Sequence, residues 1–232
     1  MRFERTIGLI GGLGPFAGAY ALTRLLEKAA TLYGCKQDEE FPEVILCSVP
    51  FKGTSPAGLQ RDNSVKADLI ESLRGLECCG VKTATILCNS SHVYLPELAR
   101  TNRIGLISLI DAPFHRLSKS DRTEFCVLCS RSARESGLFN ELARRTGKRL
   151  VRLSDKAERL TDKLIHRGML ATLSSKHVRE LQTLIEEVSS RGTRAVIIGC
   201  TELSRLNAGA SKDPHTIDTL DEALTLLLES AV

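Results

Sequence analysis

Short apolar runs alternate with longer amphipathic stretches along the chain. A short apolar run bounded by turn residues is typical of a buried strand, whereas apolar positions at helical spacing indicate a helix with one buried face. Their alternation predicts an α/β protein with mainly parallel strands. The predicted strands cover residues 7–10, 44–49, 83–87, 104–110, 125–128, 149–153 and 195–198.

Four predicted helices have recognisable ends. They cover residues 15–32, 63–79, 174–190 and 219–231. Pro15 suits a first turn, where its missing N–H costs nothing. Asn63 or Ser64 can cap the second helix, and Gly80 can end it. Gly192 follows the third.

The sequence contains a coarse internal repeat. One half opens with "IGLIGGLGP" and reaches "TILCNSS", and the other opens with "FCVLCSRS" and reaches "VIIGCTE". We therefore expect two pseudo-symmetric α/β lobes, formed by residues 1–105 with 211–232 and by residues 106–210. The terminal helix should fold back on the first lobe, and a site should lie in the cleft between the lobes.

Composition narrows the class of protein. The 232 residues are 42% hydrophobic and 26% charged, ordinary values for a soluble globular protein. A net charge of +4 is too small to indicate a nucleic-acid partner, and the basic stretch 144–152 reads as a solvated helix end. No apolar run approaches the roughly 20 residues that span a membrane, and no signal peptide is recognisable. We expect a cytoplasmic protein whose cysteines are mostly free thiols.

Two motifs resemble a cofactor site and a metal site, but the residues around them argue against both. Gly12-x-Gly14-x-x-Ala17 matches a dinucleotide fingerprint, but the second predicted strand ends without a carboxylate to hold a ribose. We expect a tight turn at Gly12 that helps to bind a small anion such as a carboxylate. Cys126 and Cys129 lie in a predicted strand, which should point their thiols to opposite faces and away from a shared metal.

Cys88 and Cys200 each follow an apolar run and precede a predicted helix. Ligands of parallel α/β sheets bind at these carboxyl ends of strands, and helix N-terminal amides lower the pKa of a thiol. Asn89, Ser90 and Thr201 add polar groups beside the two thiols. Two such cysteines in two related halves predict a pair facing each other across a cleft.

Two opposed thiols have a natural chemistry. One thiolate removes a proton from one face of a carbon, and the other thiol delivers a proton to the opposite face. His92, four residues after Cys88, could orient or buffer that thiol, and Glu202 could do the same for Cys200. Simple helix capping is the alternative for both.

"GLIGGLGP", "LCNSSH" and "IIGCTEL" closely resemble three signature stretches of the aspartate/glutamate racemases, cofactor-independent members of the Asp/Glu/hydantoin racemase superfamily. The resemblance implies a homodimer with an active site between two lobes and with neither pyridoxal phosphate nor a metal. It also implies that Cys88 and Cys200 are the acid/base pair, and that Asn89, Ser90 and Thr201 hold the α-amino and α-carboxylate groups.

The chain departs from the family pattern at several positions. Ser90 replaces the usual threonine, Ser130 stands at a second substrate-binding threonine position, and Ala133 loses a further hydroxyl. Aspartate-specific members of that family use an arginine in the loop after the second strand to grip the side-chain carboxylate, and members also carry a lysine on a helix of the second half. The basic residues near those two places are Lys52, Arg61, Lys156, Arg159 and Lys163.

The leading hypothesis is a racemase that moves a proton at Cα of a small amino acid, aspartate or glutamate. One alternative is a hydantoin racemase or another superfamily enzyme with a related substrate. The other is a member that binds an amino acid without catalysis.

Overall fold

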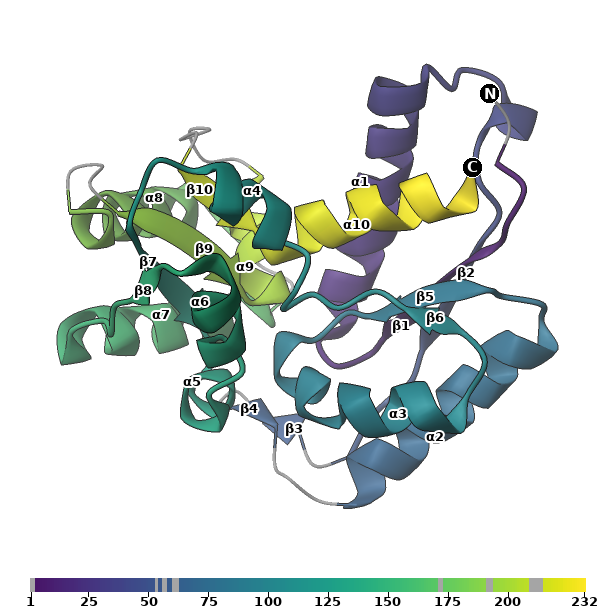
Figure 1. The fold of residues 1–232 in the computed structure, drawn as a ribbon, viewed down its shortest axis with the longest axis horizontal. Helices are drawn as coiled ribbons and strands as arrows, with labels where there is room; N and C mark the ends of the chain where they lie inside the picture. Colours follow the sequence, from purple (N-terminus) through teal and green to yellow (C-terminus); the bar gives the residue numbers. More distant parts are fainter. Residues whose placement is uncertain are drawn as a thin grey trace.

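The computed structural model describes residues 3–52, 54–55, 58–59, 63–170, 173–190, 194–208 and 215–232. Within them, two four-stranded parallel sheets are flanked by helices (Figure 1). The strands of the first are β1 (Ile7–Gly11), β2 (Val44–Ser48), β5 (Thr83–Ile86) and β6 (Gly105–Leu106). Those of the second are β7 (Glu124–Cys129), β8 (Arg149–Leu150), β9 (Ala195–Gly199) and β10 (Thr216–Asp218). A short antiparallel pair joins β3 (Thr54–Ser55) to β4 (Gly58–Leu59).

The two sheets have the same strand order. The first reads β2-β1-β5-β6, and the second, read from its β8 edge, is β8-β7-β9-β10. Each opening strand therefore lies beside the strand that leads to one of the two cysteines. This confirms the α/β class and the two related lobes expected from the internal repeat.

Helices cover both faces of each sheet. The first-lobe helices are α1 (Pro15–Tyr33), α2 (Asn63–Cys78) and α3 (Leu95–Thr101), with the 3-10 helices η1 (Asp38–Glu40) and η2 (Asn89–Tyr94). The later helices are α4 (Phe114–Lys119), α5 (Arg131–Ser136), α6 (Asn140–Thr146), α7 (Asp155–Gly168), α8 (Ser175–Val188), α9 (Thr201–Asn207) and α10 (Thr219–Ala231). None of these described helices is long and apolar enough to cross a bilayer.

Strand alternation divides the side chains between separate cores. Ile7 and Leu9 pack against α1 and α10, whereas Ile10 faces α2. Cys126 packs with α7 and α8, and Cys129 with α5 and α6, so the two thiols face opposite sides of the second sheet as predicted. All eight cysteines are free thiols.

The terminal segment connects the two lobes. After β10 pairs with β9, α10 packs against α1 beside the first sheet (Figure 1). A short strand at residues 216–218 carried no recognisable apolar run, so sequence periodicity missed it. Gly192, predicted to end a helix, lies outside the described residues.

The predicted strand 104–110 is wrong in its extent, because β6 covers only Gly105–Leu106. Ile107 still donates its N–H to the Ala84 carbonyl at 2.8 Å, so the chain leaves the sheet after it. The Ser108 hydroxyl accepts from the amides of Ile110 and Asp111, which turns the chain.

The tight turn after β1 predicts a measurable stability difference. Gly12 has φ of 101°, and a Cβ there would lie 1.8 Å from the Val49 carbonyl oxygen. Gly34 has φ of 75° with no atom within 4 Å of such a Cβ. We expect Gly34→Ala to lower the free energy of unfolding by about 1 kcal/mol, and Gly12→Ala to lower it by at least about 2 kcal/mol more. Urea denaturation measures both, and equal losses would contradict the steric explanation.

Candidate active site

The two cysteines occupy equivalent places in the two sheets. Cys88 follows β5 and caps η2, whereas Cys200 follows β9 and caps α9. Their backbones are alike, with φ −152° and ψ 111° at Cys88 and φ −152° and ψ 127° at Cys200. Cys88 is half-buried and Cys200 is 7% exposed. The same local geometry thus presents a thiol from each lobe.

Hydrogen bonds between the lobes bring the predicted residues together. The Thr201 hydroxyl lies 3.2 Å from the Leu87 carbonyl oxygen, directly before Cys88 in the chain. The hydroxyls of Ser90 and Ser130 are 2.7 Å apart. The carboxyl ends of β5, β7 and β9 therefore meet at one place, where ligands bind in α/β folds.

Ser132 completes a cluster of three hydroxyls that the sequence did not indicate. Its Oγ lies 3.0 Å from Ser90 Oγ and 3.2 Å from Ser130 Oγ. Ser130 also accepts from the Ala133 amide as the N-cap of α5. Each hydroxyl carries one hydrogen and two lone pairs, so the cluster can rearrange to donate to a carboxylate.

Asn89 is 3% exposed. Its Nδ2 donates to Thr219 Oγ1 at 3.0 Å. Its Oδ1 is buried and has no hydrogen-bond partner among the described residues. A buried acceptor without a donor is rare in folded proteins, so the site lacks one hydrogen-bond donor at this point.

Glu202 is the carboxylate next to the thiols. Cys200 Sγ donates to Glu202 Oε2 at 2.9 Å, and burial raises the pKa of the Glu202 carboxyl. A Cβ on Gly14, where φ is 99°, would lie 2.0 Å from Glu202 Oε1. A side chain at position 14 would therefore collide with Glu202.

A side chain at Gly12 would collide with the Val49 backbone. Both glycines of the turn are therefore required by contacts within the chain.

The predicted lowering of the thiol pKa values is wrong. Burial, and after it the charge of Glu202, raise the pKa of Cys88 to about 11, outweighing the Ser90 and Ser91 amides that lower it. Burial, and then the same carboxylate, raise the pKa of Cys200 well above its ordinary value. Helix-start amides are present at both thiols, but desolvation of the thiolate is the larger effect.

His92 supports the backbone of Cys88 rather than its thiol. The Leu109 amide donates to Nε2 at 2.9 Å, so the ring hydrogen is on Nδ1, which lies 2.9 Å from the Cys88 carbonyl oxygen. Burial lowers the pKa of His92 to about 4, so the ring is neutral near pH 7. A neutral ring argues against the predicted buffering role, and the contact of His92 with Cys88 is to the main-chain carbonyl.

Four of the five basic residues named as candidate side-chain grips are described, and all four are exposed. Lys156 pairs with Glu187 at 3.4 Å. Arg61 lies outside the described residues. Among the described cations, none makes a hydrogen bond to a side chain of a predicted site residue.

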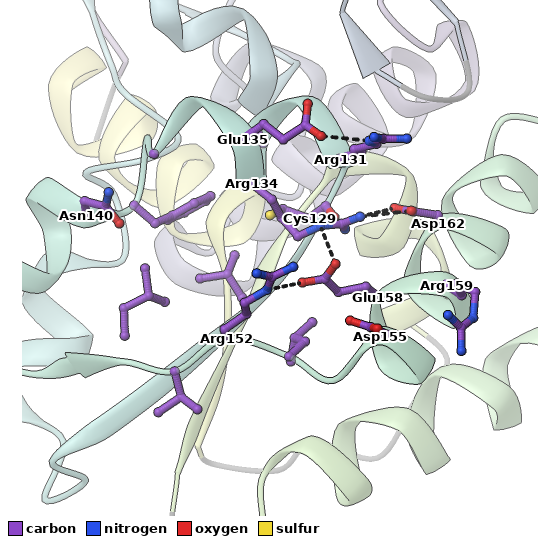
Figure 2. A pocket seen from close by; sticks show the side chains of 17 residues that line it. Cys129, Arg131, Arg134, Glu135, Asn140, Arg152, Asp155, Glu158, Arg159 and Asp162 are labelled. Atoms are coloured by element: carbon purple, nitrogen blue, oxygen red, sulfur yellow. Dashed lines mark hydrogen bonds and ion pairs between the residues drawn. The ribbon is translucent and has the colours of Figure 1, made fainter.

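One cavity of about 650 Å³ lies in the second lobe, between α5, α6, the end of β8 and α7 (Figure 2). None of the nine predicted site residues lines it. Arg134 extends across it, donating to the Cys129 carbonyl and to both Asp162 oxygens at 2.9 Å. Arg152 pairs with Glu158 at 3.2 Å on the other side (Figure 2). Ion pairs line this cavity, and neither Cys88 nor Cys200 is among its lining residues.

The basic stretch 144–152 is neutralised within the protein. Its partners are Glu141 for Arg144, Asp111 for Arg145, Glu124 for Arg149, Glu158 for Arg152, and the Ser120 and Arg122 carbonyls for Lys148. This agrees with a solvated helix end rather than a surface for nucleic acid.

Comparisons with known proteins agree with this architecture. The model of the Asp/Glu/Hydantoin racemase family matches residues 10–227. RacX of Bacillus subtilis (strain 168), a broad specificity amino-acid racemase, is 23% identical over 201 residues, covering 85% of this chain and 86% of that protein.

Two solved structures show the same fold. Aspartate racemase of Picrophilus torridus has a TM-score of 0.79 at 20% identity, covering 98% of this chain and 94% of that one. Glutamate racemase of Campylobacter jejuni has a TM-score of 0.66 at 18% identity, covering 97% and 85%.

The neutral, buried His92 predicts a pH-dependent stability. An unfolded histidine titrates near pH 6.5 and the folded one near 4, so the unfolded chain binds more protons between these values. The stabilisation is complete above about pH 6.5, and on the order of 3 kcal/mol is lost as the pH falls towards 4.

Urea denaturation from pH 7.5 to 4.5 measures this loss. We expect His92→Gln to lose less stability over that range than the wild type, while exposed His115→Gln follows the wild type. Asp218, whose pKa burial raises to about 6, titrates in all three proteins and cancels in the comparison. Parallel curves for wild type and His92→Gln would contradict the assignment.

Proposed function

The chain belongs to the Asp/Glu/hydantoin racemase family, and we propose that it is an amino-acid racemase that uses Cys88 and Cys200 as its acid and base without a cofactor. The observation that carries the proposal is the equivalent placement of the two thiols. Each follows a central strand with a similar backbone conformation, and the segments after β5 and β9 meet through Thr201 and Leu87. A proton can then be removed on one face of Cα and returned on the other.

In this proposal Glu202 is the base that first deprotonates Cys200. Because burial raises the pKa of its carboxyl, Glu202 is a better proton acceptor than an exposed glutamate. It takes the proton of Cys200 along the 2.9 Å hydrogen bond. The thiolate then forms beside a neutral carboxylic acid instead of a carboxylate, which removes the repulsion that otherwise raises the pKa of Cys200.

The reaction then moves two protons. In one direction the Cys200 thiolate takes the α-proton: the C–H bond breaks, an S–H bond forms, and the electron pair spreads from Cα into the substrate carboxylate. Cys88 gives its proton to the opposite face and becomes the thiolate. The proton on Glu202 returns to the thiol pair as product leaves.

The developing carbanion needs donors on the substrate carboxylate. The hydroxyls of Ser90, Ser130 and Ser132 and the amides that begin η2 are placed beside Cys88. Donors held in position before the reaction stabilise such charge without reorganisation. We assign the carboxylate to this cluster and the amino group to Asn89.

Aspartate and glutamate are the first substrates to test, because the family motifs indicate them. The matched relative RacX is named for broad specificity, and the described residues that hydrogen-bond within the site include no cation. The substrate panel therefore extends to neutral and basic amino acids.

Hydrogen exchange in D₂O tests the activity. We expect at least one L-amino acid in the panel to lose its α-proton, detected by NMR, and to form its D-enantiomer, detected by chiral chromatography. Cys88→Ser and Cys200→Ser should each reduce racemisation by about 10²- to 10⁴-fold, since each removes an acid/base group. Exposed Cys79→Ser should retain full activity. Absence of exchange with every amino acid would contradict the proposal.

Glu202→Gln tests the proton acceptor. The amide keeps the shape but cannot take the Cys200 proton, so kcat should fall about 100-fold in both directions while KM changes less than about threefold. Glu187→Gln, on the surface of α8, is the matched control and should leave both constants unchanged. An unaltered kcat in Glu202→Gln would remove Glu202 from the mechanism.

A further inference from the structure

We infer that Thr219, the first residue of α10, is a positioning residue that sets the orientation of the Asn89 amide for the substrate amino group. This inference rests on the proposed function. Thr219 is fully buried, and its partner Asn89 is 130 residues away in the sequence. No motif in the sequence indicated it.

The hydrogen bonds of the Thr219 hydroxyl have only one arrangement. Its Oγ1 lies 3.0 Å from the Ile198 carbonyl oxygen, which can only accept, so the single hydroxyl hydrogen is donated there. The lone pairs of Oγ1 remain free to accept. Toward Asn89 the hydroxyl can therefore only accept. The Asn89 side-chain atom that lies 3.0 Å from Oγ1 must then be the donor Nδ2 and not the acceptor Oδ1.

This constraint decides which end of the amide faces the site. With Nδ2 held by Thr219, Oδ1 is the free end of the amide, and it is buried without a partner among the described residues. A ligand that fits there must bring a donor. The ammonium group of an α-amino acid brings three, and Asn89 directly follows Cys88, so such a group would be held beside Cα.

The start of α10 is rigid enough to perform this task. Asp218 accepts from the Leu220 amide at 3.0 Å and from the Ser204 hydroxyl at 2.8 Å. Thr219 is thus fixed between β9 on one side and Asn89 on the other. The C-terminal helix would then contribute to substrate binding without touching the substrate.

Two substitutions separate positioning from packing. Thr219→Val keeps the shape but removes the hydroxyl, so the amide can turn and present Nδ2 to the ammonium. We expect KM to rise about 10- to 100-fold, the range lost with a hydrogen bond to a charged group, while kcat changes less than about threefold. Thr219→Ser keeps the hydroxyl and should restore KM to within about threefold of the wild type.

Equal KM values in the wild type and Thr219→Val would overturn the inference. So would a Thr219→Ser variant as impaired as Thr219→Val, because then lost packing and not the hydroxyl would be responsible. Thermal unfolding of both variants verifies that each is folded at the assay temperature.

Calorimetric binding separates this inference from the proposed function. L-aspartate and L-glutamate are compared with succinate and glutarate, which lack the amino group. Thr219→Val should weaken binding of the amino acids at least about tenfold and leave binding of the deaminated acids unchanged. If the protein binds the amino acids in this way but never racemises them, the inference stands and the proposed function fails. If it racemises them and Thr219→Val binds them normally, the inference fails alone. Binding of none of the amino acids in the substrate panel overturns it.

Discussion

The hydrogen bond from Thr201 to the Leu87 carbonyl is the contact on which the rest of the site depends, because it joins the ends of β5 and β9 at the residues beside the two thiols. Each sheet is a complete α/β layer with its own cores, and neither contains both cysteines. The proposed proton transfer on two faces of Cα needs both thiols together, so it would depend on contacts between the lobes rather than on either sheet alone. Two further hydrogen bonds, Ser90 to Ser130 and Asn89 to Thr219, belong to the same seam, by which we mean the line of contact between the two lobes.

Burial at this seam makes the two thiols unlike each other. Both have raised pKa values, but among the described residues only Cys200 has a carboxylate in direct contact, whereas Cys88 has the amides of η2. Desolvation favours the protonated thiols, and in the proposed mechanism Glu202, whose pKa is raised by the same burial, would offset that cost for Cys200. In the proposed mechanism, burial of the thiol and the need for Glu202 as a base are therefore linked, because a more exposed Cys200 would need Glu202 less.

The sequence predicts what depends on neighbouring residues and misses what depends on distant ones. An apolar run followed by polar residues placed Cys88 and Cys200 at strand ends, because that pattern is local. The partnership of Asn89 with Thr219 spans 130 residues, and no spacing rule reaches so far. The direction of the thiol pKa values was wrong for the same reason, since burial is a property of packing. Strand β6 ended early because the Ser108 side chain competes for backbone amides.

The cavity of the second lobe follows from the shortness of β8. The Phe125 carbonyl accepts from the Val151 amide, and because alternate residues of a strand face the same edge, the Cys129 carbonyl points to the side that β8 has left. Arg134 takes the place of the missing strand by donating to that carbonyl, and Asp162 neutralises its charge. The ion pairs around the cavity thus complete the edge of β7 directly before Ser130. Because β8 is too short to pair here, the contact of Arg134 on α5 with Asp162 on α7 supports the strand end that carries Ser130.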